Sequence, residues 1–170
     1  NGDGTLVAGE RYSIDTPYWQ DYSIQVADLN RDQIPDLVIM IPLTDVTVAA
    51  VARRSKIIVR LGDGHCAFGS EIGLDADGDF SHIVVGDLDG DEIPDLVASA
   101  SERLGTFHGN GDGSFSNRQD FAVGGIPRQI AVTDWNSDGI PDVVASDDYL
   151  HLLLGIGGGR FAPAIDCALA

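Results

Sequence analysis

An acidic segment of eleven residues occurs three times in this chain, and it limits the possible folds more than any other feature of the sequence. Every copy follows the pattern D-x-[DN]-x-D-x-I-P-D-apolar-Val. A segment that recurs at intervals of tens of residues usually marks a repeated structural unit. The copies therefore predict a row of similar units. They span residues 28–38, 87–97 and 134–144.

Side chains that carry oxygen occupy positions 1, 3, 5 and 9 of each copy. A tight loop that brings them to one point would hold a hard cation, and Ca2+ fits oxygen ligands of this kind best. Without a cation, two carboxylates about 4 Å apart would repel each other by roughly 4 kcal/mol at an effective dielectric near 20. A solvated Asp/Asn turn is the alternative for a single copy, but three copies in register favour calcium. The predicted side-chain ligands are Asp28, Asn30, Asp32 and Asp36, then Asp87, Asp89, Asp91 and Asp95, and then Asp134, Asn136, Asp138 and Asp142.

The residues after each loop exclude an EF-hand and predict a strand. An EF-hand needs a bidentate Glu at position 12, whereas Ile39, Ala98 and Ala145 stand there. Each loop runs instead into Leu-Val or Val-Val, and β-branched residues favour strands. The predicted metal therefore lies on a connection between two strands.

A second feature, a Gly-Asp-Gly turn, alternates with the metal loops. Such turns supply positive φ at little cost and favour hairpins. With 21 glycines and short apolar runs between the turns, the sequence predicts an all-β fold of many short strands. The turns lie at residues 2–4, 62–64 and 111–113, with a degenerate copy at 157–159.

The strands predicted between these features form three units of four. Antiparallel four-stranded units at this period are typical of β-propeller blades. The metal loop joins strands 1 and 2 of a unit and the Gly-rich turn joins strands 3 and 4, so both share one face. The expected blades are residues 22–73, 74–123 and 124–170, preceded at 1–21 by the outer strand of another blade and a connection. The expected strands are 23–27, 36–41, 56–61 and 67–72, then 82–86, 95–100, 103–108 and 114–123, and then 128–133, 142–146, 149–154 and 160–166.

Because loop and turn recur together in this order, the chain resembles integrin-α-type FG-GAP/VCBS repeats over almost its whole length. The resemblance implies a β-propeller with one Ca2+ in each loop, about three per chain. It also implies that a backbone carbonyl at position 7, from Ile34, Ile93 or Ile140, completes each site. Gln33 and Glu92 stand where the family usually has a left-handed Gly, at a cost of about 1 kcal/mol each.

Three blades and a spare strand are too few to close a ring, which usually has about six to eight blades. An open arc would leave apolar blade faces in water at both ends. We therefore expect the chain to belong to a longer propeller, to associate with copies of itself, or to be completed by a partner chain.

Proteins similar to this chain usually bind ligands on the face opposite the calcium loops, and the resemblance implies the same here. Between strands 2 and 3, the first unit has about ten more residues than the others, at 44–55. This insertion carries Arg53 and Arg54, which could hold an anionic partner, and a solvated hairpin tip is the alternative. Tyr18 and Trp19, in the connection before the first blade, could stack on a sugar ring or a peptide, or pack between blades.

Two further segments have both a functional and a structural interpretation. Asp75, Asp77 and Asp79 could hold an extra cation, although a simple acidic turn explains them as well. Trp135 follows the first ligand of the third loop, in a place that Leu takes in the other two loops. We therefore expect Trp135 in the core.

Charge and composition restrict the partners and the location. The net charge of −17 argues against nucleic acid and against anionic membranes as partners, so we expect no nucleic-acid partner. No apolar run is long enough to enter and span a membrane, and we expect any export signal to have been removed or to lie outside this sequence. Loops of this type fill at extracellular calcium levels, which predicts a secreted or cell-surface protein. Cys66 and Cys167 fall two blades apart, too far for a disulfide, so we expect free thiols.

These observations favour a calcium-stabilised extracellular propeller that acts as a binding or adhesion module, either lectin-like for a glycan or for a protein ligand. The sequence contains neither G-x-S-x-G nor H-E-x-x-H and predicts no catalytic residue. The alternative is a part of a secreted lyase or hydrolase that acts on polysaccharides, because some propellers similar to this chain are such enzymes. Calcium would have a structural role in both cases.

Overall fold

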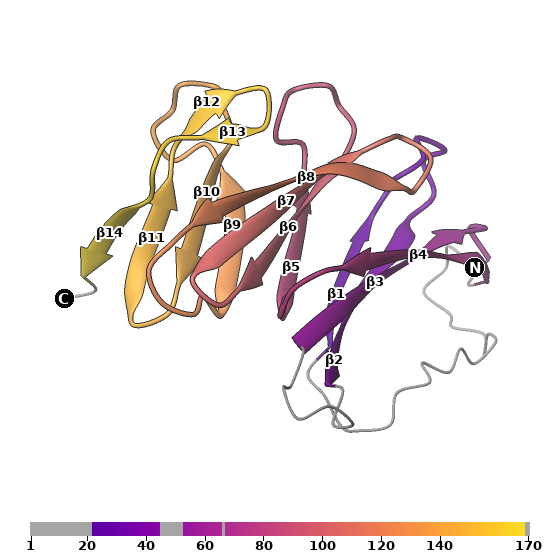
Figure 1. The fold of residues 1–170 in the computed structure, drawn as a ribbon. Coiled ribbons are helices and arrows are strands. Elements are labelled where there is room, and N and C mark those ends of the chain that lie inside the picture. Colours follow the sequence, from indigo (N-terminus) through magenta and orange to yellow (C-terminus); the bar gives the residue numbers. More distant parts are fainter. Residues whose placement is uncertain (1–21, 45–52, 66, 169–170) are drawn as a thin grey trace, which may run out of the picture.

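The computed structural model of the chain describes residues 22–44, 53–65 and 67–168, and their regular structure consists of antiparallel strands (Figure 1). They form three four-stranded sheets and one two-stranded sheet. None of the described segments forms a helix that could span a lipid bilayer. The first sheet contains β1 (Ser23–Ala27), β2 (Asp36–Thr44), β3 (Arg53–Gly62) and β4 (Phe68–Ala76). The second contains β5 (His82–Gly86), β6 (Asp95–Ala100), β7 (Arg103–Gly109) and β8 (Phe115–Ala122). The third contains β9 (Gln129–Thr133), β10 (Asp142–Ser146), β11 (Tyr149–Leu153) and β14 (Ile165–Ala168), and β12 (Gly155–Gly157) pairs with β13 (Arg160–Phe161) between β11 and β14.

The observed strands follow the predicted ones closely, with two informative differences. β2 and β3 are longer than expected, because Thr44 pairs with Arg53 and the ends of the 44–55 insertion extend the hairpin. The fourth strand of the third unit, expected as one strand over 160–166, is divided into β13 and β14. Pro163 lies in the gap, and a proline has no amide hydrogen to continue a strand ladder.

Two hydrophobic cores hold the sheets together, one on each side of the second sheet. The first core joins Met40 and Ile57 of the first sheet to Leu96 and Phe107 of the second. The second core joins Val97 of the second sheet to residues of the third, Val143, Ala145 and Leu153. Successive side chains of a strand point to opposite faces, so Leu96 and Val97 of β6 enter different cores. All six residues of β6 are buried for this reason.

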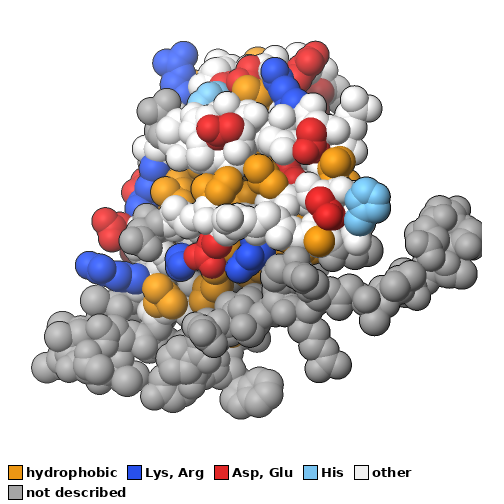
Figure 2. Space-filling view, turned by 90° about the vertical axis from the view of Figure 1, so that its right-hand side faces the viewer, with side chains coloured by type: hydrophobic (Ala, Val, Ile, Leu, Met, Phe, Trp, Pro, Cys, Tyr) orange, Lys and Arg blue, Asp and Glu red, His pale blue; other side chains and the backbone are white. Residues whose placement is uncertain are grey.

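The outward face of the first sheet is apolar as well. Ile24 pairs with Ile39, and Val26 pairs with Leu37, so these side chains lie on one face of β1 and β2. Ile24 and Val26 are nevertheless 53% and 64% exposed. Figure 2 views the molecule from the side on which β4 lies in Figure 1, and it shows hydrophobic side chains in short bands between acidic and basic ones. Apolar surface of this kind is typical of a place where a neighbouring element packs.

Trp135 is not in the core, contrary to the expectation from the sequence. Its equivalents Leu29 and Leu88 are buried, Leu29 in the first core and Leu88 in the second. Each of these leucines therefore packs between its own sheet and the next one along the chain. The third sheet has no following sheet among the described residues, and Trp135 is 56% exposed.

The strand pairing also corrects the alignment of the turns. Gly62 pairs with Phe68, and the equivalent pairs are Gly109 with Phe115 and Gly155 with Phe161. The expected match of residues 62–64 with 111–113 is therefore wrong by two positions. A Cβ on any of these three glycines would collide with the backbone carbonyl of the proline in the adjacent metal loop, so the close approach requires glycine there.

Candidate metal centres

The aspartate at position 9 of each loop is the first residue of a strand, and its side chain is buried. In the first loop, Asp36 Oδ2 accepts the Leu29 amide at 2.8 Å, and Asp36 Oδ1 accepts the Gly62 amide at 2.8 Å. We call this pair of hydrogen bonds the carboxylate clasp, because it joins the start of the loop to the end of the third strand. In the other loops, Leu88 and Gly109 donate to Asp95 at 2.9 and 2.8 Å, and Trp135 and Gly155 donate to Asp142 at 2.8 and 2.7 Å.

The clasp puts a carboxylate where water cannot reach it easily. Burial raises the pKa of Asp95, and the neighbouring Asp89 carboxylate raises it further, against the opposing effect of the Gly109 and Leu88 amides and of His108. A divalent cation beside such a group would favour its ionised form. The electrostatics of the second loop are therefore those of a site that gains from binding a cation.

The aspartate at position 1 closes each loop from the other side. Asp28 accepts the Asp32 and Gln33 amides at 3.1 and 2.8 Å. Its carboxylate therefore faces the backbone of the turn, as a loop that converges its oxygens requires. In the third loop the equivalent amides, of Asp138 and Gly139, donate to Asp134 at 3.0 and 3.0 Å. In the second loop Asp87 accepts the amide of Glu92 at 2.9 Å and, one position earlier than in the other loops, the amide of Gly90 at 2.7 Å.

Positions 3 and 5 distinguish the second loop from the other two. Asn30 donates its side-chain amide to Asp32 at 2.9 Å, and Asn136 donates to Asp138 at 2.8 Å. The second loop has an aspartate at both positions, and carboxylate oxygens of Asp87, Asp89 and Asp91 lie within 4.8 Å of one another. Among the described residues, this is the group of three loop carboxylates close enough to share one ion. At position 7, the amides of Ile34, Ile93 and Ile140 each donate to the position-5 carboxylate at 2.8 Å.

The backbone of the loops is left-handed at two positions. At position 6, φ is 65° for Gln33, 65° for Glu92 and 82° for Gly139, as the resemblance implied. Position 4 is left-handed too, with φ of 63° at Arg31 and 62° at Ser137. The glycine at position 4 of the second loop was the available sequence signal for this second strained position.

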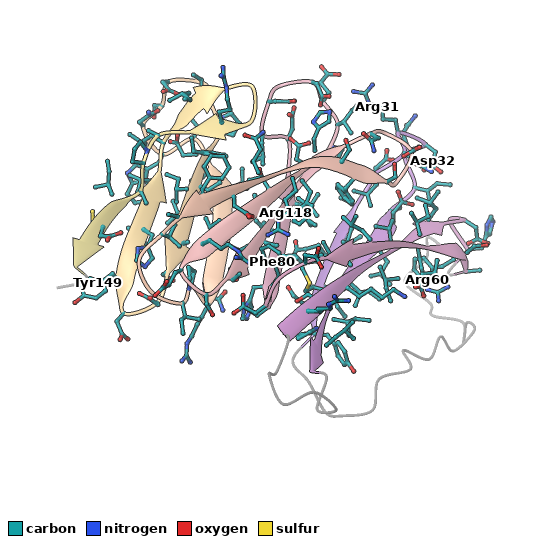
Figure 3. The ribbon with its side chains drawn as sticks, in the orientation of Figure 1. Arg31, Asp32, Arg60, Phe80, Arg118 and Tyr149 are labelled. Carbon is teal, nitrogen blue, oxygen red and sulfur yellow. The ribbon has the colours of Figure 1, made fainter. Side chains whose placement is uncertain are left out.

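Arg31 connects the first two loops. Its guanidinium Nη2 donates to the backbone carbonyl of Asp91 at 2.6 Å. Figure 3 shows Arg31 and Asp32 at the same end of the molecule, opposite the end where Tyr149 lies. A cationic side chain thus reaches from one acidic loop to the next and offsets part of their mutual repulsion.

His108 of β7 lies against the second loop and contacts its carboxylates. Sequence reasoning did not assign this role to the residue. Its Nδ1 is 3.3 Å from Asp89 Oδ2 and 3.2 Å from Asp95 Oδ1. The spacing of the histidines along the chain gave no sign of this. An alignment of the repeats by their strand pairing would have singled out His108, because Leu61 and Leu154 occupy the equivalent position in the other repeats.

The predicted ligand-binding residues are only partly within the described structure. Tyr18 and Trp19 lie outside the described residues. Arg53 and Arg54 belong to strand β3 and not to a loop, which corrects their expected position. Arg54 is exposed and pairs with Leu43 across the hairpin, far in sequence from any metal loop.

The acidic turn before β5 has protein partners at its last aspartate. Asp79 accepts the Ser101 hydroxyl at 2.6 Å and lies 3.8 Å from the Arg103 guanidinium. Burial alone would raise the pKa of Asp79, but the Ser101 hydrogen bond and Arg103 bring that pKa below its usual value. Arg118 lies 4.8 Å from the centre of the next residue's ring, Phe80, in a cation–π contact (Figure 3). These contacts hold Asp79 and Phe80 against the second sheet.

A second cluster, at the end opposite the metal loops, surrounds His151. The ring is buried, with Nδ1 at 2.7 Å from Asp166 and Nε2 at 3.2 Å from Asp147. Asp147 also accepts the Ile126 and Tyr149 amides, both at 2.9 Å. One carboxylate therefore holds the connection between β8 and β9 beside the start of β11, and Ile126 and Tyr149 are exposed there. We call Ile126 and Tyr149 the apical pair.

The described residues have the architecture of a β-repeat protein. It is an all-β chain of consecutive four-stranded sheets, and each sheet has an acidic loop between its first two strands. Residues 43–98 and 87–145 match the FG-GAP-like repeat. The chain therefore belongs to the FG-GAP-like repeat family, as its loop and turn motifs indicate.

One solved structure with a similar fold is that of an Agrocybe aegerita lectin, whose title describes specific recognition of non-reducing terminal N-acetylglucosamine. The two share 14% sequence identity, with a TM-score of 0.50. The similarity covers 86% of this chain and 52% of the lectin chain, so this chain spans about half the length of the lectin. No curated protein matches the sequence.

Proposed function

We propose that the chain forms blades of a calcium-stabilised extracellular β-propeller that acts as a binding module. The observation that carries the calcium part is the repetition of one loop geometry three times, each with a buried carboxylate at position 9 and an inward carboxylate at position 1. Oxygen donors of this number and charge suit Ca2+. The side chains at positions 1, 3, 5 and 9 and the carbonyl at position 7 would hold one ion per loop.

The role of calcium in this proposal is structural. The position-9 carboxylates already join each loop, through the clasp, to the glycine at the end of the third strand or, in the third repeat, just after it. An ion on the same carboxylates would tie positions 1, 3 and 5 to that strand as well. Binding energy to the folded state adds to its stability. Such loops would be full at the calcium levels found outside cells, which is why we propose a secreted or cell-surface location.

The proposal includes further blades beyond the described sheets. Ile24 and Val26 expose aliphatic side chains on one outer face, and Trp135 is exposed where its equivalents pack on a following sheet. A neighbouring blade on each side would bury these residues. The blade could come from the same polypeptide, from a second copy or from a partner, and the molecular mass in solution distinguishes these sources.

The proposed ligand is a glycan or a protein bound on the face opposite the metal loops. The apical pair supports this placement, because Tyr149 and Ile126 are 53% and 57% exposed on adjacent connections. An aromatic ring held at a rigid turn can stack on a sugar ring, and its hydroxyl can hydrogen-bond. The lectin fold of the similar structure makes a glycan the first ligand to test. Tyr18, Trp19, Arg53 and Arg54 remain proposed contributors.

A glycan array, run with calcium and with a chelator, tests the binding function. We expect calcium-dependent glycan binding that Tyr149→Ala or Trp19→Ala abolishes while the melting temperature in calcium stays unchanged. Val26→Ala, on an outer sheet face, is the matched control and should leave glycan binding intact. Binding to no glycan, together with capture of a protein ligand through the same residues, would assign a protein ligand instead. Ligand binding that survives both aromatic substitutions would contradict the proposed face.

A further inference from the structure

We propose that Asp89, Asp95 and His108 bind a transition-metal ion of the zinc class, in addition to the calcium proposed for the second loop. The three ligands come from three segments: the loop between β5 and β6, the first residue of β6, and β7. Their ligand atoms, two carboxylate oxygens and one imidazole nitrogen, lie within 4.8 Å of one another. Imidazole nitrogen favours zinc-class ions, whereas Ca2+ takes oxygen ligands.

The measured separations fit a small ion. Zinc bonds to nitrogen and oxygen are about 2.0 to 2.2 Å long, so two ligands of a tetrahedral site are roughly 3.3 to 3.6 Å apart. His108 Nδ1 is 3.3 Å from Asp89 Oδ2 and 3.2 Å from Asp95 Oδ1. Both separations from the imidazole nitrogen are therefore close to those between two ligands of one zinc ion.

Comparison of the three repeats singles out the same residues. His108 precedes the glycine that receives the clasp, and Leu61 and Leu154 precede that glycine in the other repeats. Asp89 is at position 3, where the other loops have asparagine. The second repeat thus differs from both neighbours at each of these positions, and the two side chains are in contact.

A pocket of about 190 Å³ opens beside the three ligands. Thr106 and Gln119 of the second sheet line it, together with Gly158 and Gly159 from the hairpin of the third sheet. The glycines place no side chain over Asp89. A fourth coordination position would therefore face the pocket and remain open to water or to a small ligand, as in zinc sites that are not purely structural.

The second loop has enough negative charge for two ions. Its four aspartates, at positions 1, 3, 5 and 9, balance two divalent cations. Asp89 can be a ligand of both ions, because its Oδ1 lies within the loop, where it accepts the Asp91 amide at 3.2 Å, and its Oδ2 faces His108. The first and third loops have one carboxylate fewer and no imidazole at the equivalent place, so we expect one such site per chain.

Titration of Co2+ into the calcium-saturated protein tests the inference, because Co2+ occupies zinc sites and absorbs visible light when it binds. We expect one Co2+ per chain with an absorption band that Zn2+ abolishes. His108→Leu, which restores the residue of the other repeats, should weaken Co2+ binding by at least about tenfold, since even the loss of a ligand's own hydrogen-bond partner typically costs 10- to 100-fold. His65→Leu removes an exposed imidazole of the first repeat and should change nothing.

Two results would overturn the inference: no cobalt band in the wild-type protein, or equal cobalt affinity in His108→Leu. His108→Gln keeps a polar side chain without the imidazole and must show the same loss, so the test holds if the leucine variant folds poorly. A protein that binds calcium and no cobalt contradicts this inference alone. A protein that binds cobalt through His108 and no calcium contradicts the proposed function alone.

Discussion

The second acidic loop and its two neighbours have the same backbone conformation and hydrogen-bonded carboxylates, but they differ in the side chains at and around position 3. All three loops have the carboxylate clasp at position 9 and left-handed residues at positions 4 and 6. At position 3, Asn30 and Asn136 each pair with a loop carboxylate, whereas Asp89 faces His108. The comparison separates two roles. The aspartate at position 9 holds the loop in place through the clasp, and the choice of Asn or Asp at position 3 sets the charge of the loop.

The largest predicted effect concerns the position-9 carboxylate, which all three loops share. Asp95→Asn leaves an amide group facing a buried backbone N–H of the clasp, and an unsatisfied buried donor costs about 1 to 3 kcal/mol. With the loss of a calcium ligand, we expect at least about 2 kcal/mol less unfolding free energy in saturating calcium. Urea unfolding measures it. Asp36→Asn and Asp142→Asn should show similar losses.

Asp77→Asn is the matched control for the clasp, because Asp77 is an exposed aspartate outside the loops. Surface substitutions of this kind usually stay within about 0.5 kcal/mol. A larger loss for Asp77→Asn than for Asp95→Asn would show that the carboxylates that hold this fold have been misassigned.

The next prediction tests the difference at position 3. Asp89→Asn gives the second loop the composition of the others and should weaken its calcium binding by about tenfold, equivalent to about 1.4 kcal/mol, because ligand charge tunes affinity in such sites. Asn30→Asp is the reverse change and should strengthen the first loop by a similar factor. Isothermal titration calorimetry resolves both. If neither substitution changes the calcium affinity of its loop, the residue at position 3 does not determine that affinity.

A smaller effect concerns the left-handed residue at position 6. Glu92→Gly and Gln33→Gly remove a side chain from a backbone with φ of 65° in both cases. A residue with a side chain costs roughly 1 to 2 kcal/mol in this region of φ, and glycine avoids that cost. Part of this stabilisation is lost, because glycine has more conformational freedom in the unfolded state. We expect a net stabilisation of about 0.5 to 1 kcal/mol in thermal unfolding. Gly139→Ala in the third loop should destabilise by a similar amount, and the same sign in all three loops would contradict the assignment.

The smallest effect contrasts the clasp with a carboxylate at the opposite end. The pKa of Asp147 lies below its usual value near 3.8. The main cause is the hydrogen bond from the Tyr149 amide, and the Ile126 amide and His151 add to it. The stability from ionised Asp147 is therefore complete above that value and is lost as the pH falls through the lower folded-state pKa. Asp147→Asn should destabilise more at about pH 5 than at about pH 2. Asp148→Asn, at an exposed neighbour, should show no such difference, and an equal loss for Asp147→Asn at both pH values would refute the mechanism.

Sequence reasoning succeeded where the signal was local. The loops, the strands that follow them and the left-handed position 6 depend on residues close together in the chain, and the predicted strands β1, β5, β6 and β10 have the observed bounds. The turns were harder, because the same letters Gly-Asp-Gly occur two residues apart in different repeats. Only the pairing of Gly62 with Phe68 shows which glycine is equivalent to which.

The remaining features depend on contacts between distant residues. Trp135 follows the pattern of Leu29 and Leu88, but the pattern does not state whether a sheet lies beyond it. His108 and His151 meet their carboxylates through strand register and sheet packing. No spacing along the chain encodes those contacts, so sequence alone assigned neither histidine a role.

Calcium titration of the chelator-treated protein, followed by thermal unfolding with and without the ion, shows whether the three loops bind calcium that stabilises the fold. We expect about three calcium ions per chain, one for each loop, and a melting temperature that falls by several degrees in chelator and recovers when calcium returns. Binding of no calcium, with the same melting temperature in chelator and in calcium, would contradict it.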